Sequence, residues 1–224
     1  MSRKVRYLVG AGVLLALLVV AVPFAYARWI APDAAAPLAI TPGSGTAAGE
    51  LAGSYTVGPG SEAGYRVGEL LFGQRVEAVG RTSGVSGPVE LSGTEVTSGE
   101  VTVDMSTVTS DDGRRDEYFL GDLMETDRYP TAVFTLTGPL DLGPEFADGT
   151  PAEVTATGTL TVKDVTREVT FPLAAARDGD TVNASGAIPI TFTDFGIEPP
   201  AFGDVVTVDD TGEVEFLLAL TPAG

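Results

Sequence analysis

The stretch RRDEYFLGDLMETDRYPTAVF, residues 114–134, changes its hydrophobic period halfway along. Its first half carries four apolar side chains at the spacing i, i+1, i+4 and i+5, which is one face of a helix: Phe119, Leu120, Leu123 and Met124. Pro130 ends any helix and favours an extended conformation at Tyr129. From Thr131 onward polar and apolar residues alternate, which is the period of a β-strand. The stretch therefore predicts one short amphipathic helix that leads directly into a strand.

Alternation with a period of two also dominates the rest of the chain. Further strand-like runs begin at five apolar residues: Val101, Val154, Val169, Ile188 and Val214. Turns that contain Gly or Asp separate these runs at intervals typical of antiparallel meanders. Because each run is apolar on one face only, the strands must close into a barrel or stack as a sandwich.

Two features favour the barrel over the sandwich. Many residues expected on the inner face are small, so side chains are not expected to fill the interior: Ala132, Ala156, Gly158, Ala184 and Gly186. The single helix is placed to cover one opening of a barrel, and about eight strands enclose just enough space for a small apolar ligand. The predicted fold class is therefore all-β, an antiparallel barrel with one short capping helix.

The N-terminal region carries a membrane or export signal. Residues 7–27 contain no charge and are long enough to span a bilayer, and Arg3, Lys4 and Arg6 precede them. This cationic flank predicts a cytoplasmic N-terminus and a single-pass transmembrane helix, with the C-terminal domain extracytoplasmic. The alternative is a signal peptide and a secreted protein, because Ala25-Tyr26-Ala27 matches the small-x-small cleavage pattern.

The sequence predicts three consecutive parts. Residues 1–30 form the transmembrane anchor (or signal peptide). Residues 31–53 are rich in Ala, Pro and Gly and predict a flexible linker. Residues 54–224 have the size of one domain, which buries ~70% of its unfolded-chain surface and has no need of disulfides.

The composition excludes several classes of function. The chain has no Cys and no His, so thiolate nucleophiles, disulfides, zinc-thiolate sites and His-dependent triads are excluded. The residues after the apolar stretch carry ten basic and 31 acidic side chains, a formal net charge of −21. Such a charge argues against binding to nucleic acid and to anionic headgroups. We expect no enzyme activity, no metal and no cofactor. A hydrolase that uses two facing carboxylates in the interior stays as a further alternative.

Four sequence blocks in order resemble the YceI-like domains, a family of lipocalin-like barrels associated with polyisoprenoid binding. They are VGRTSGVSG at 79–87, RD at 115–116 with YPTAVF at 129–134, GTLTVKDVTR at 158–167, and DFGI at 194–197 with GDVV at 203–206. Together they cover most of residues 54–220. The resemblance implies an extracytoplasmic barrel that binds and sequesters a long isoprenoid or quinone-like lipid without catalysis.

The residues expected to line such a site are mainly aromatic and aliphatic. They are Tyr65, Val67, Leu71, Phe72, Phe119, Leu120, Leu123, Met124, Phe134, Phe171 and Phe192. The alternative for each is ordinary core packing, since aromatic side chains also fill small barrels. The alternative function is a ligand-free envelope stress or interaction module that uses its acidic outer surface. A cavity of several hundred cubic ångströms favours the lipid site, and a packed interior favours the module.

Arg115 and Asp116 have two interpretations. Arg115 could contact a ligand headgroup at the mouth of the barrel. Alternatively, the pair braces the start of the helix, where an acidic residue in the first turn is favourable.

Overall fold

The computed structural model describes residues 34–41, 51–71, 73–202 and 206–223. Within these residues, no helix has the length and apolar character needed to cross a membrane. The transmembrane segment predicted within 1–30 lies outside the described residues.

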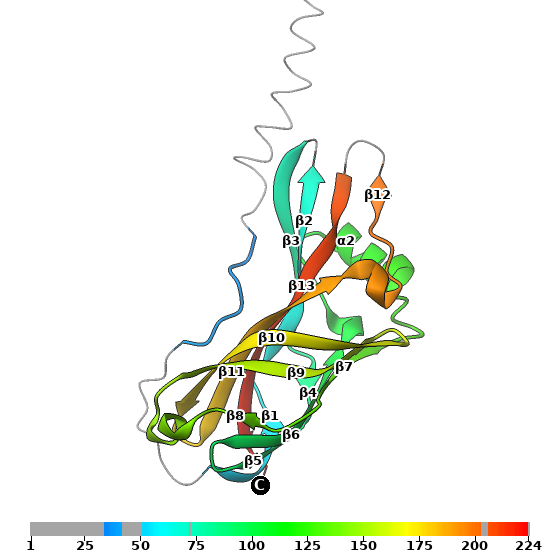
Figure 1. Cartoon of the computed structure of the whole chain (residues 1–224). Helices are drawn as coiled ribbons and strands as arrows, with labels where there is room; N and C mark the ends of the chain where they lie inside the picture. Colours follow the sequence, from blue (N-terminus) through cyan, green and yellow to red (C-terminus); the bar gives the residue numbers. More distant parts are fainter. Residues whose placement is uncertain (1–33, 42–50, 72, 203–205, 224) are drawn as a thin grey trace, which may run out of the picture.

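The described strands form one antiparallel sheet that curls into a barrel (Figure 1). Their bounds are β1 Ala52–Val57, β2 Glu62–Leu71, β3 Gln74–Thr82, β4 Val85–Ser86, β5 Pro88–Ser92, β6 Glu95–Asp104, β7 Thr131–Leu136, β8 Leu140–Asp141, β9 Ala152–Val162, β10 Val165–Asp178, β11 Thr181–Thr191, β12 Ala201–Phe202 and β13 Val206–Pro222. Eight of them close a ring in the order β1-β5-β6-β7-β9-β10-β11-β13, and β13 pairs back with β1. The barrel predicted from the alternation is confirmed.

The ring closes differently at its two ends because β13 is much longer than its partners. Its last residues pair with β1, and its first half pairs with β2 instead, through a register shift between Val208 and Gly212. The hairpin β2–β3 therefore extends one end of the barrel, where Figure 1 places α2 and β12. The opposite end, with β1, β5 and β8, also holds the C-terminus.

The predicted helix forms but is not uniform. α2 spans Gly113–Tyr118, and one π-helical turn, η2, follows at Phe119–Leu123. Short 3-10 turns complete the elements: η1 Met105–Thr107, η3 Pro144–Asp148 and η4 Phe192–Phe195. The π turn shows in the bond from the Met124 amide to the Phe119 carbonyl, and such turns often occur at functional sites. Phe119 and Met124, at the two ends of this bond, are both buried.

The buried apolar residues divide into two clusters along the barrel. The packed end centres on Phe146, which is only 1% exposed, and includes Leu51, Leu91, Val182 and Leu220. The second cluster lies under the helix and contains Phe119, Met124, Leu160, Phe171 and Ile188. We call this half the cavity end, because the space described next lies there.

Candidate ligand-binding site

A cavity of about 230 Å³ lies at the cavity end of the barrel. Side chains from the strands form its wall, and Phe119, Leu123 and Met124 of the helical segment cover it. Among the 29 residues that line it, the only charged ones are Glu69 and Arg115. Their side chains are 13% and 27% exposed, so this side of the cavity is its mouth. The arrangement suits a ligand with a long apolar part and one polar end.

The structure places most of the predicted lining residues in this wall. Eight of the eleven line the cavity: Tyr65, Val67, Phe119, Leu123, Met124, Phe134, Phe171 and Phe192. Leu71 has the same strand parity as Val67 but lies at the last position of β2, beyond the mouth, and is not in the wall. Leu120 is half-buried and packs against the surrounding apolar cluster but is not in the wall. Phe72 lies outside the described residues.

The cavity stays hollow because aromatic rings lie flat against glycines of neighbouring strands. A Cβ at Gly80 would be 2.3 Å from the Tyr65 ring, and one at Gly158 would be 2.3 Å from the Phe134 ring. A Cβ at Gly212 would be 2.7 Å from the Phe192 ring, and one at Gly186 would be 2.8 Å from the Phe216 ring. Each ring thus occupies the space of a missing side chain, and it remains at the wall rather than at the centre.

Ring-to-ring contacts hold these aromatic side chains in place. Tyr65 stacks on Phe119 with centroids 5.0 Å apart, which attaches the helical segment to β2. Phe171 meets the edges of Phe134 and Phe216 at 5.5 and 5.7 Å. Such pairs add about 0.5–1.5 kcal/mol each beyond area burial.

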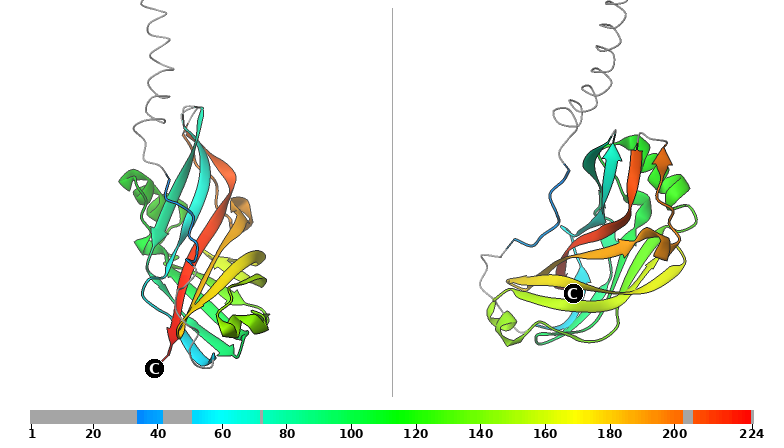
Figure 2. Two further views of the ribbon diagram at one scale, coloured as in Figure 1. Left: turned by 90° about the vertical axis from the view of Figure 1, so that its left-hand side faces the viewer. Right: turned by 45° about the horizontal axis from the view of Figure 1, so that its top comes forward.

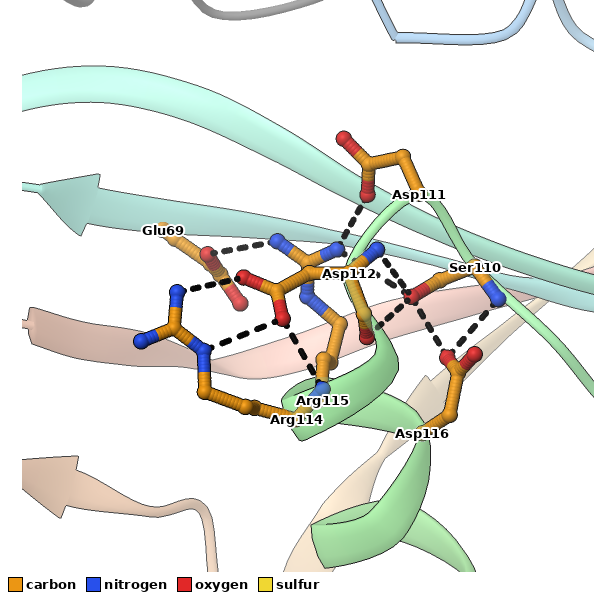
Figure 3. A network of polar contacts seen from close by, with 7 residues as sticks. All are labelled: Glu69, Ser110, Asp111, Asp112, Arg114, Arg115 and Asp116. Atoms are coloured by element: carbon orange, nitrogen blue, oxygen red, sulfur yellow. Dashed lines mark hydrogen bonds and ion pairs between the residues drawn. The ribbon is translucent and has the colours of Figure 1, made fainter.

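The mouth carries a connected polar network (Figure 3). Arg115 forms an ion pair with Asp111 and lies 3.8 Å from a carboxylate oxygen of Glu69. Burial raises the pKa of Glu69 above its ordinary 4.5, and the nearby Arg115 opposes this shift. Burial also raises the pKa of Tyr65 to about 12, so its hydroxyl stays protonated at neutral pH. The mouth thus offers guanidinium and hydroxyl donors beside one partly buried carboxyl group.

The same loop also braces the helix. Asp112 caps α2 by accepting a hydrogen bond from the Arg114 amide, and Asp116 accepts bonds from the amide and hydroxyl of Ser110 at 2.8 and 2.6 Å. The two interpretations of Arg115 and Asp116, contact with a headgroup and bracing of the helix start, therefore apply to different residues of the pair. Asp116 braces the helix start, and Arg115 lies in the cavity wall.

Sequence reasoning did not select several residues that line the cavity. They include Val101, Val103, Met105, Val108, Leu160, Ile188, Ile190, Ile197, Val214 and Phe216. Strand alternation indicated their inward face, but it could not separate the hollow half of a strand from the packed half. Glu69 was missed because a charged residue at an inward position does not look like a lining residue, although it shares the parity of Tyr65 and Val67.

Residues 55–220 match the family model of the YceI-like domain. No curated protein matches the chain. The match covers the whole barrel from β1 to the last part of β13, and it includes every residue in the cavity wall.

Solved structures share the same fold at low sequence identity. A polyisoprenoid-binding domain from Saccharophagus degradans, implicated in plant cell wall breakdown, aligns with a TM-score of 0.60 and 17% identity over 77% of this chain and 99% of that one. Burkholderia cenocepacia BcnA aligns with a TM-score of 0.54 and 21% identity, over 74% of this chain and 95% of BcnA. A Campylobacter jejuni YCEI protein aligns with a TM-score of 0.53 and 17% identity, over 65% of this chain and 85% of that protein.

Proposed function

The chain belongs to the YceI-like domain family, and on that premise we propose that it binds and sequesters an isoprenoid or quinone-like lipid inside its barrel. The observation that carries the proposal is the cavity, whose wall is apolar except for Glu69 and Arg115 at the mouth. Each buried methylene of a ligand contributes ~0.8 kcal/mol, so an apolar chain needs few polar anchors. The name of the Saccharophagus domain, which states polyisoprenoid binding, supports the same ligand class.

The volume of the cavity limits how much of the lipid it encloses. At about 230 Å³ it lies below the roughly 300–1,000 Å³ of typical ligand pockets. We expect the end of the tail to fill the interior and the rest to extend through the mouth, or lining side chains to move apart. Met105 and Met124 are suited to such movement, because methionine has three rotatable bonds and adapts to irregular space.

The polar mouth would hold the headgroup. Arg115 and Tyr65 would donate hydrogen bonds to a carbonyl or hydroxyl oxygen of the headgroup. Glu69 would accept a hydrogen bond when it is ionised and donate one when it is protonated. No bond is made or broken in this scheme. The protein would work as a carrier on the outer side of the cytoplasmic membrane, anchored through residues 7–27.

Lipid extraction tests the proposal directly. The full chain is purified from its own membranes, extracted with organic solvent and examined by mass spectrometry. Leu123→Arg places a charge in the cavity wall, whereas Thr135→Arg places one on the exposed outer face of β7 as a matched control. We expect one discrete lipid per chain from the wild type and the control, and at least a tenfold loss from Leu123→Arg with little change in thermal unfolding.

Two results would contradict the proposal. Equal recovery of a lipid from both variants would identify it as bulk membrane lipid. Recovery of none, repeated after incubation with polyprenyl lipids and quinones, would favour the interaction module that uses the acidic outer surface.

A further inference from the structure

Residues 34–41 lie along the outer wall of the barrel as an extended strap, visible in both views of Figure 2. The strap is held through its main chain. The Ala35 carbonyl accepts a hydrogen bond from Arg66 at 2.6 Å, and the Ala36 carbonyl accepts one from Arg81. The amide of Ile40 donates to the Ser185 hydroxyl at 3.1 Å. These contacts join the strap to β2, β3 and β11.

The strap covers a charged cluster. Arg66 and Arg81 both form ion pairs with Glu215. Strand alternation places Arg66 and Glu215 on the outer face, because their chain neighbours Tyr65 and Phe216 line the cavity. Charged side chains on an outer face are normally solvated, yet Arg66 is 9% and Glu215 only 2% exposed. The hydrogen bond from Arg66 to the strap identifies the strap as part of the cover.

The strap runs in a defined direction. Its first residue, Ala34, borders a recess with Gly68 and Asp209, which are the chain neighbours of the mouth residues Glu69 and Val208. Ile40 meets Ser185, whose partner on β13 is Leu217, next to Leu218, which belongs to the packed cluster and also borders the cavity. In Figure 1 the segment runs from beside β2 and β3 toward the end that holds the C-terminus. The chain therefore enters the strap beside the cavity mouth and runs toward the packed end.

We propose that this strap holds the cavity mouth against the membrane that contains residues 7–27. The inference rests on the membrane anchoring in the proposed function. Six residues separate the apolar segment from Ala34, and even fully extended they reach roughly 25 Å. A linker free up to Leu51 would reach roughly 85 Å and leave the barrel free to turn. The docked strap removes that freedom and presents the mouth to the bilayer, where an apolar ligand resides.

The rim of the mouth fits this orientation. Among the described residues, Leu70 is the most exposed large apolar side chain, at 40%, and it lies on the tip of β2 beside Glu69. Leu71, Pro199 and Pro200 are half-buried near the same opening. These apolar side chains, beside the charged network of Glu69, Arg115 and Asp111, are suited to an uncharged or zwitterionic lipid surface.

Hydrogen exchange on the full chain tests whether the strap is docked. We expect the Ile40 amide to exchange roughly tenfold more slowly than in a free peptide. Arg81→Gln removes a strap contact four residues away and should return that amide to the free rate. Arg75→Gln is the matched control, because Arg75 lies on the same strand and its hydrogen bond goes to Asp209 rather than to the strap. Free exchange in the wild type overturns the proposal and leaves lipid binding untouched.

Energy transfer tests the orientation. The chain has no Cys, so Glu198→Cys near the mouth and Glu145→Cys at the packed end each give a single labelling site. The full chain is placed in phosphatidylcholine vesicles with acceptor-labelled lipid. We expect strong transfer from position 198 and weak transfer from position 145. Replacing residues 34–41 with eight Gly and Ser residues, or Arg81→Gln, should remove the difference.

These measurements distinguish a failure of the strap proposal from a failure of the proposed lipid binding. Equal transfer from the two positions in the otherwise unaltered chain, or a difference that survives the Gly-Ser replacement, overturns the strap proposal. Lipid extraction from the same samples reports the carrier function independently. A chain that does not float with vesicles contradicts the anchor, and the strap proposal fails with it.

Discussion

The two halves of the barrel are built from the same strands and yet differ in how their interiors are filled. At the packed end, Phe146 inserts from a 3-10 turn and closes the interior. At the cavity end, rings lie over glycines and leave the centre open. The comparison indicates that the packed end supplies stability and the cavity end supplies binding. Substitutions that exchange these properties test it.

The largest expected effect follows from removing a ring at the packed end. Phe146→Ala should lower the free energy of unfolding by about 3–5 kcal/mol, because it leaves a cavity in a closed core. Phe192→Ala should cost about half as much, because its ring already borders empty space. Chemical denaturation measures both. Equal losses would remove the distinction between the halves.

A larger side chain introduced at each end of the barrel should also distinguish the two halves, by its effect on stability at the packed end and on lipid binding at the cavity end. Val182→Phe at the packed end should cost about 1–3 kcal/mol by forcing neighbours apart, with lipid binding retained. Val103→Phe projects into the cavity and should cost less than about 1 kcal/mol while it abolishes lipid binding. Unfolding and lipid-extraction measurements on both variants check this. Lipid binding that survives Val103→Phe would mean that the ligand does not occupy this cavity.

A smaller change tests the glycines. Gly80→Ala brings a methyl group to 2.3 Å from the Tyr65 ring, whose side chain supplies all three nearest atoms, and should push the ring inward, at a cost of about 1–3 kcal/mol and with weaker lipid binding. Gly99→Ala is the control, because the nearest atom to its Cβ is 3.8 Å away. Calorimetric unfolding temperatures of the two variants should differ, and identical values would show that the rings move freely.

The smallest effect concerns pH. The pKa of Glu69 is raised in the fold above 4.5, so the folded state retains a proton that the unfolded state loses. Its contribution to stability is therefore present below about pH 4.5 and is lost as pH rises through the folded-state pKa. Glu69→Gln should remove this step from the pH profile of unfolding. An unchanged profile would mean that Arg115 compensates the burial completely.

The sequence predicted much of this molecule because its signals are local. The switch of period at Pro130, the alternation in Val154–Val162 and the small inward residues led to a closed barrel with one helix, which is confirmed. The family resemblance is confirmed as well. The π turn was not predictable from the same spacing, because a one-residue change in helical pitch leaves the apolar pattern unchanged, and it separates Phe119 from Leu120.

The candidate site was predictable only in part. The sequence indicated which residues face inward, and eight of the eleven selected residues line the cavity. Whether they bind a ligand stays a prediction. Arg66 and Glu215 look like solvated outer-face charges in the sequence, but the strap and the neighbouring Arg81 cover them in the fold. That strap falls within residues 31–53, where composition alone predicted a flexible linker.

By itself the sequence determined the strand faces, the position of the helix and the chemistry that the chain lacks. Periodicity depends only on residues close together in the chain, and composition does not depend on the fold. Tertiary structure decided which half of the barrel is hollow. That outcome depends on Tyr65 lying opposite Gly80 and Phe216 opposite Gly186, across strands whose register no local pattern specifies. The same cross-strand placement brings Glu69 to Arg115 and turns the open end into a mouth.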